Sequence, residues 1–225
     1  MITTLLYSLL ALDKTLSALA AEHAVVLFIA LFLVIFAETG LVVFPLLPGD
    51  SLLFLSGTVA ATAGLDIHLL VLTLCAAAVL GDSVNYAVGR FIGPIAFQRP
   101  QDTFLGRWLK PEYLERTHRF YEKYGGFTII IGRFVPIVRT FAPFLAGVGA
   151  MTYRKFILFN VAGAAAWVAS LAYAGYLFGN IPWVKDNLAW IIVGIVVVSL
   201  IPMALAYLKE RREKRAATGE RSEEP

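Results

Sequence analysis

The chain has 225 residues, of which 59% are hydrophobic and 16% are charged. A soluble protein carries about 25% charged residues, so this composition excludes an ordinary soluble domain and indicates a membrane protein. The net charge of +3 is too small to indicate a nucleic-acid-binding protein. With about 20 residues for each crossing, there is room for roughly four to six spanning or half-spanning segments.

Residues 1–22 are predicted to form an amphipathic helix that lies on the membrane surface. Its apolar face would consist of leucines that recur at helical spacing, namely Leu5, Leu9, Leu12, Leu16 and Leu19. A membrane transport domain would then occupy residues 23–208.

Six apolar segments follow along the chain, at residues 24–37, 41–64, 67–93, 127–149, 153–179 and 187–208. Two of them, 67–93 and 153–179, are long enough to cross a bilayer with some tilt. The last segment, 187–208, is predicted to cross the membrane as well.

The segments 41–64 and 127–149 differ from the others because each contains two prolines and several glycines, which interrupt helices. We expect both to be re-entrant hairpins, which dip into the membrane and return to the side that they entered. Their expected hinge residues are Pro45, Pro48, Gly49, Pro136 and Pro143. The first hairpin would fold back at Pro48–Gly49 and the second at Pro143.

Basic residues are concentrated in two places, a central segment at 94–123 and a tail at 209–225. The positive-inside rule places both in the cytoplasm, together with the N-terminus. The central segment is predicted to be helical, and the tail to be polar and largely disordered. In this topology 67–93 runs inward and 153–179 runs outward, so the two hairpins enter the membrane from opposite faces.

Two short sequence matches relate the halves of the chain. Pro45…Ser56-Gly57-x-x-Ala60 matches Pro136…Ala146-Gly147-x-x-Ala150, and Gly89-x-x-x-Gly93 matches Gly175-x-x-x-Gly179. Inverted repeats with broken helices are typical of secondary transporters, whose sites lie at the repeat interface. The sequence therefore predicts an all-α polytopic membrane protein, built as an inverted repeat in which two opposed re-entrant hairpins accompany spanning helices.

Each hairpin motif carries two charges of one sign within an apolar run, and the two motifs have opposite signs. Glu38 and Asp50 flank the first proline-rich turn, where they could share a cavity and exchange a proton. Arg133 and Arg139 flank Pro136, and their planar guanidinium groups suit the oxygens of a phosphate. The alternatives are a structural salt bridge for the acids and interfacial snorkelling for the arginines.

A third acidic residue, Asp82, lies within the segment 67–93, with Asn85 and Tyr86 on the same helical face. It could relay protons, pair with an arginine or act as a polar clamp between helices, and the sequence leaves these alternatives open.

Other polar and aromatic residues are interpreted as structural. Thr140 and Asn160 could line a polar site, but packing between helices is the preferred interpretation. Trp167 is expected to belong to an interfacial belt or to helix packing. No nucleophile arrangement, metal-ligand cluster, phosphate-binding loop or dinucleotide motif is visible in the sequence. We therefore predict a transporter rather than an enzyme, with no metal and no cofactor.

Four motifs together resemble the DedA family of bacterial inner-membrane proteins over roughly residues 25–180. They are Glu38…Pro48-Gly49-Asp50, Gly132-Arg133-Phe-x-Pro136-x-x-Arg139-Thr140, Gly81-Asp82-Ser83-x-Asn85-Tyr86 and Tyr153-Arg-Lys-Phe-x-x-x-Asn160-x-x-Gly163. The family's paired acidic residues match Glu38 and Asp50, and its paired arginines match Arg133 and Arg139.

The resemblance implies recycling of a polyprenyl phosphate lipid carrier, notably undecaprenyl phosphate, from the outer to the inner leaflet of the inner membrane. It also implies use of the proton gradient. The expected partners are this lipid, protons and membrane lipids, without nucleic acid. The alternatives are a cation/proton antiporter for pH and membrane-potential homeostasis and an uncoupled lipid scramblase. The oligomeric state stays open, with a homo-oligomer among the alternatives.

Overall fold

The computed structural model describes residues 23–40, 49–97, 126–179 and 181–186, together with five single positions outside these ranges. The described residues form helices and short connections and contain no strand, which confirms the all-α prediction. The helices are α2 (Ala24–Gly40), α3 (Gly49–Ala63), α4 (Ile67–Phe97), α7 (Phe127–Gly132), α8 (Pro136–Val148), α9 (Tyr153–Phe178) and α10 (Pro182–Asp186).

Several predicted elements lie wholly or mostly outside the described residues. They are the amphipathic helix at 1–22, the hinge residues Pro45 and Pro48, the basic segment at 94–123, the last spanning segment at 187–208 and the tail at 209–225.

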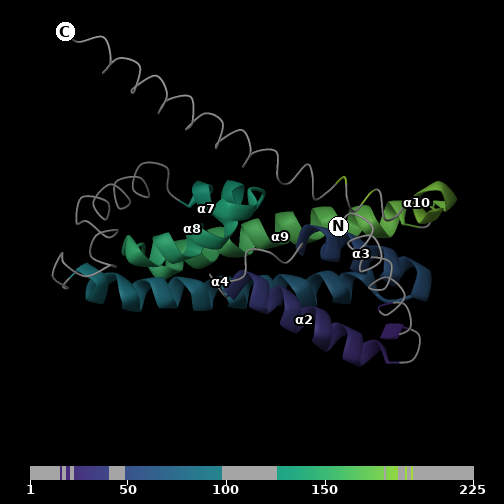
Figure 1. Cartoon of the computed structure of the whole chain (residues 1–225), viewed down its shortest axis with the longest axis horizontal. Coiled ribbons are helices and arrows are strands. Elements are labelled where there is room, and N and C mark those ends of the chain that lie inside the picture. The colour runs from purple at the N-terminus through teal and green to yellow at the C-terminus, as the bar shows by residue number, and fades with distance from the viewer. Residues whose placement is uncertain are drawn as a thin grey trace, which may run out of the picture.

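Two helices, α4 and α9, are long and apolar enough to cross a membrane, over Ile67–Gly93 and Tyr153–Phe178. They are two of the three segments that the sequence predicts to span, and the third, 187–208, lies mostly outside the described residues. The helices lie against each other and run in opposite directions, as Figure 1 shows. The predicted antiparallel relation of these two segments is therefore present in the structure.

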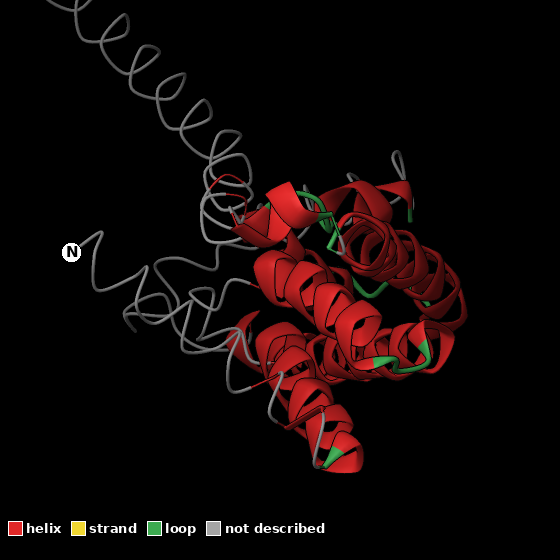
Figure 2. Cartoon of the chain, turned by 90° about the vertical axis from the view of Figure 1, so that its right-hand side faces the viewer, coloured by secondary structure: helices red, strands yellow, loops and turns green. Residues whose placement is uncertain are grey.

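The remaining helices pack along this antiparallel pair. The helices α2 and α8 pack on α4, while α3 and α7 pack on α9. In Figure 1, α3 and α8 lie toward opposite ends of the α4–α9 pair. The end-on view in Figure 2 shows the described helices gathered into one bundle.

Glycines bring α3 and α9 to backbone contact. A Cβ atom on Gly57 of α3 would run into the carbonyl oxygen of Ala172, and one on Gly175 of α9 would run into that of Phe54. Each glycine therefore faces the residue that lies three positions before the opposite glycine. Small residues allow this close approach between membrane helices.

The pair α8 and α4 repeats this arrangement. A Cβ atom on Gly147 of α8 would meet the carbonyl oxygen of Tyr86, and one on Gly89 of α4 would meet that of Phe144. The offset of three residues is the same as between α3 and α9. The two short sequence matches thus fall at two helix contacts of equivalent geometry.

The chain turns between α7 and α8 at residues 133–135, immediately before Pro136. Val135 has an extended backbone, with φ −118° and ψ 109°, as the residue before a proline prefers. Pro136 is then the first residue of α8, where its missing N–H costs nothing. Gly49 similarly stands at the first position of α3.

The prediction that the second hairpin folds back at Pro143 is wrong, because Pro143 lies inside α8. A proline in a helix removes one backbone hydrogen bond and distorts the preceding turn, but neighbouring helices can supply a substitute. Here the Asn85 side chain of α4 donates to the carbonyl oxygen of Thr140, at 2.8 Å, in that preceding turn. It also donates to the Thr39 carbonyl of α2 at 3.4 Å.

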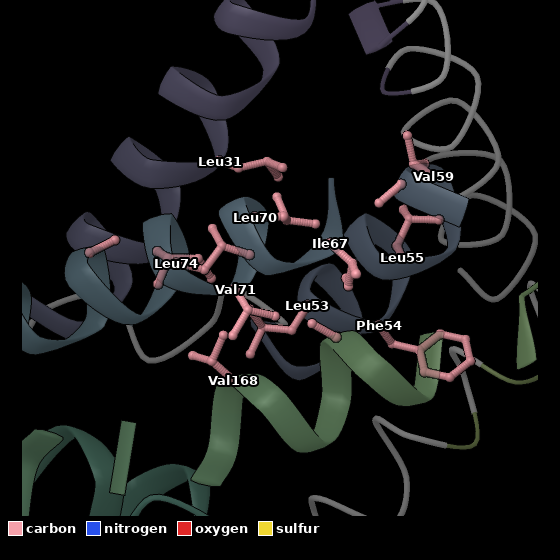
Figure 3. Packing of buried hydrophobic residues seen from close by; sticks show 14 of the residues in the cluster. Leu31, Leu53, Phe54, Leu55, Val59, Ile67, Leu70, Val71, Leu74 and Val168 are labelled. Atoms are coloured by element: carbon pink, nitrogen blue, oxygen red, sulfur yellow. The ribbon is translucent and has the colours of Figure 1, made fainter. Parts of the chain in front are cut away.

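The largest group of buried apolar side chains joins α2, α3, α4 and α9, as Figure 3 shows. Leu31, Leu53, Leu74 and Val168 are among its members. A smaller group surrounds Tyr86, whose hydroxyl donates to the carbonyl oxygen of Met151 in the turn before α9. These two groups of apolar side chains pack the described helices against one another.

We expect Gly57→Ala and Gly147→Ala each to destabilise the protein by about 1–3 kcal/mol, because the added Cβ overpacks a facing backbone. Thermal unfolding of the purified protein in detergent measures this effect. Gly194→Ala is the control, since no described heavy atom lies within 4 Å of a Cβ at that position. If both variants melt at the same temperature as the control variant, these helices are not held at backbone contact.

Candidate functional site

Five charged side chains meet between the helices, and most of each is buried. Glu38 is 4% exposed, Asp82 is 1%, Arg133 is 2% and Arg139 is 8%. The fifth, Asp50, has a side chain that is 18% exposed. These are the two predicted acids, the two predicted arginines and the acid that the sequence left open.

Arg139 of α8 joins two carboxylates that come from different helices. Its Nη2 donates to Glu38 Oε1 at the end of α2, at 2.5 Å. Its Nη1 donates to Asp50 Oδ1 in the first turn of α3, at 2.8 Å. Because the fork of a guanidinium holds two donors in a fixed plane, Arg139 sets the relative position of these two helix ends.

Arg133, in the turn between α7 and α8, makes a second ion pair. Its Nη2 donates to Asp82 of α4 and to the side-chain oxygen of Asn160 on α9. Asn160 is itself held by a hydrogen bond from its Nδ2 to the Val79 carbonyl, at 3.1 Å. The other donors of Arg133, Nε and Nη1, are buried and have no hydrogen-bond partner among the described residues.

Trp167 of α9 completes the site. Its indole Nε1 donates to Asp50 Oδ1 at 2.9 Å. The centroid of its ring lies 4.6 Å from the guanidinium carbon of Arg139 and 6.0 Å from that of Arg133. Both distances are within the range of cation–π attraction.

Two glycines make room for these charges. A Cβ on Gly49 would run into the carboxylate of Glu38, so glycine lets the start of α3 approach that carboxylate. The start of a helix carries a partial positive charge, which favours a carboxylate there. On α9, a Cβ at Gly163 would lie 3.1 Å from Cδ of Arg133, so a small residue is needed where this arginine passes.

Comparison with known proteins assigns the family. A model described as the VTT domain matches residues 47–177, which is more than half of the chain. The protein DedA of Escherichia coli strain K12 is 50% identical over 206 residues, covering 91% of this chain and 92% of that protein. This chain belongs to the DedA family. The resemblance predicted from the motifs is confirmed.

Two further relatives of this DedA-family chain are named as membrane proteins. An uncharacterized membrane protein of Mycobacterium leprae is 42% identical over 192 residues, covering 85% of this chain and 84% of that protein. The inner membrane protein YqjA of Escherichia coli strain K12 is 36% identical over 156 residues, covering 69% of each chain. No solved structure matches the chain. The DedA-family chain is thus a membrane protein, in agreement with its composition and its two long apolar helices.

The structure of this DedA-family chain shows which arginine contacts Asp82. Its carboxylate pairs with Arg133, while its helical neighbours Asn85 and Tyr86 bind backbone carbonyls instead. Asn160, for which the sequence analysis prefers packing over polar lining, and Trp167, which it assigns to an interfacial belt or packing, contact the charged groups directly. No sequence signal marks Trp167, because the residues that it contacts are distant along the chain.

The formal charges of this cluster do not cancel. Three carboxylates face two guanidiniums, so the cluster carries one net negative charge when every group is ionised. A single bound proton would neutralise it. Charges buried in a membrane are costly unless they are paired, so the surplus carboxylate is the costly member of this cluster.

We expect Arg133→Gln to destabilise the protein by about 3–5 kcal/mol at neutral pH, because it leaves Asp82 buried without its cationic partner. The double variant Arg133→Gln/Asp82→Asn should recover at least half of that loss, since no unpaired charge remains. Thermal unfolding of the parent, both single variants and the double variant gives the coupling energy. A double variant as unstable as Arg133→Gln would contradict the ion pair.

Proposed function

We propose that this DedA-family protein is a proton-coupled transporter that flips a polyprenyl phosphate, such as undecaprenyl phosphate, across the bacterial inner membrane. The observation that carries the proposal is the pair of buried arginines, which are held by three carboxylates, one of them Asp82 at the middle of the spanning-length helix α4. Buried charge in a membrane domain usually marks a substrate or ion pathway.

The depth of the cluster supports a transport site. Asp82 is the central residue of α4, with fifteen residues of the helix on either side. That is about 22 Å of helix in each direction. The hydrocarbon core of a bilayer is about 30 Å thick, so a spanning α4 brings Asp82 close to the midplane.

The two arginines differ in how they would receive a phosphate. Both terminal nitrogens of Arg139 are bound to carboxylates, whereas Arg133 has two buried donors without partners among the described residues. A phosphate would therefore contact Arg133 first. It would then displace Glu38 and Asp50 from Arg139, while the prenyl tail remains in the bilayer.

Charge balance links this exchange to protons. A phosphate monoester carries a charge of about −1.5 to −2 at neutral pH. It would enter a cluster that is already negative by one when fully ionised. Uptake of protons by Glu38 or Asp50, with Asp82 as a further candidate, would offset this added charge, and their release would accompany phosphate departure.

We propose in addition that the fold is an inverted repeat with two opposed re-entrant hairpins. The equivalent glycine contacts of α3 with α9 and of α8 with α4 support it, as does the location of α3 and α8 toward opposite ends of the molecule. The positive-inside rule puts the basic central segment and both termini in the cytoplasm. The name of the relative YqjA supports the inner membrane as the location.

The surplus carboxylate also suits a cation/proton antiporter, which needs acidic residues at its site. Two buried guanidiniums favour an anion over a cation, because they would repel the cation from the same cluster. An uncoupled scramblase would have no use for a titratable cluster at this depth.

Arg133→Ala is expected to reduce flipping of a labelled polyprenyl phosphate in reconstituted vesicles by about tenfold or more, since a charged hydrogen bond is worth about 1.5–3 kcal/mol. Arg133→Lys should fall between this variant and the parent, because it restores charge without the planar fork. Arg90→Ala is the control, since Arg90 is exposed near the end of α4. Flipping by Arg133→Ala at the parent's rate would exclude the phosphate site.

Glu38→Gln is expected to remove most of the stimulation of flipping by an imposed pH gradient, because the amide cannot carry the coupled proton. The measurement compares initial rates with and without the gradient, at equal lipid concentration. Asp66→Asn, at the exposed start of α4, is the control that keeps its helix cap. Gradient-driven flipping that survives in Glu38→Gln would contradict proton coupling at this residue, and proton flux driven by a cation without lipid would favour the antiporter.

A further inference from the structure

Trp167 is an unusual residue for the middle of a charged site. It is 1% exposed and lies on the face of α9 that also presents Asn160 and Gly163 to the interior. Tryptophans of membrane proteins gather at the two lipid–water interfaces, where the N–H reaches water. Trp167 instead places its N–H on a buried carboxylate, so its location calls for another explanation.

The indole holds one ion pair through two different contacts. Its N–H donates to Asp50 Oδ1, the same oxygen that receives Nη1 of Arg139. Its ring face lies 4.6 Å from the guanidinium carbon of Arg139. Trp167, Asp50 and Arg139 therefore form a closed triangle in which each member contacts the other two.

The same ring also lies within reach of the second arginine. The guanidinium carbon of Arg133 is 6.0 Å from the ring centroid. An aromatic face attracts cations without neutralising them, whereas a carboxylate removes the charge that an anion would recognise. The Trp167 ring can thus hold Arg133 and Arg139 near one another while both guanidiniums stay available to an anionic ligand.

We propose that Trp167 is a positioning residue of the substrate site, which keeps Arg139 in place when an anionic phosphate headgroup displaces the carboxylates. The indole N–H retains Asp50 beside the site, and the ring face retains Arg139. This inference rests on the proposed function, because it assigns Trp167 a role in binding the lipid phosphate. The ligand class is a phosphate monoester that carries a long apolar tail.

Two substitutions separate the contacts of the indole. Trp167→Phe keeps an aromatic face and loses the N–H, and Trp167→Leu loses both. The charged and titratable groups around this region are Glu38 of α2, Asp50 of α3, Cys75 and Asp82 of α4, Arg133 of the α7–α8 turn and Arg139 of α8. A change in pH profile therefore reports on the whole cluster.

The first experiment measures the half-saturating lipid concentration, the maximal rate and the pH profile of flipping of undecaprenyl phosphate in vesicles. Trp167→Leu should raise the half-saturating concentration about tenfold, which is the order expected for loss of a desolvated cation–π contact. Trp167→Phe should raise it by less than about threefold and shift the pH profile, since only the bond to Asp50 is lost. Trp183→Phe, in the exposed part of α10, should change neither.

The second experiment needs no lipid, so its result is independent of the proposed function. In a protein whose other tryptophans are replaced by phenylalanine, Trp167 fluorescence reports on the charges beside the indole. We expect Arg139→Gln and Asp50→Asn each to shift its emission maximum, and Arg90→Gln to leave it unchanged.

The outcomes of the two experiments are distinct. A parent protein that does not flip the lipid, while the emission shifts are present, would reject the proposed function and with it the binding role of Trp167. A parent that flips, with Trp167→Leu and Trp167→Phe both lowering only the maximal rate, would reduce Trp167 to a packing residue and leave the proposed function intact. If the emission shifts are absent, Trp167 does not contact Asp50 and Arg139, and the inference fails.

Discussion

The arrangement of this molecule depends on the two hydrogen-bonded ion pairs of Arg139. Its guanidinium joins the end of α2 to the beginning of α3 from a third helix, α8. A charge at this depth is tolerated only because its partners are supplied by several elements at once. Gly49 at the start of α3, the break before α8 and the close packing of α3 on α9 all help to bring those partners within reach. Trp167 ties the same pair to α9, so four helices converge on one guanidinium.

A helix break allows Arg133 to reach the centre of the bundle. The turn that carries Arg133 exists because Pro136 ends the helical path before it and begins a new helix after it. Pro143, by contrast, does not end a helix. It remains inside α8, and Asn85 of the neighbouring helix binds the Thr140 carbonyl in the turn that the proline distorts. The same residue type thus begins a helix at one position and lies within it at another.

This contrast shows how far the sequence could predict the molecule. Spanning length and apolar composition were sufficient for α4 and α9, since both follow from the bilayer thickness. Opposite charges in two apolar motifs were sufficient to identify both acids and both arginines as candidate site residues. The sequence could not predict the partner of Asp82 or the contacts of Trp167, because each depends on a side chain that is distant along the chain. Nor could it predict that Pro143 lies inside a helix, because proline occurs both at helix breaks and within helices of membrane proteins. Local patterns identify the charged residues, and only tertiary packing decides how they are paired.

The glycine contacts have a consequence for the origin of such a chain. The helix α3 packs on α9 and α8 packs on α4, so each half of the sequence provides a helix whose glycine partner lies in the other half. A chain of half this length would contain α3 without α9, or α8 without α4. It could build the same contacts only by pairing with a second copy in the opposite orientation. A gene duplication that fused two such copies would produce the present exchange of helices directly, and it would leave matching glycines at both ends of the molecule.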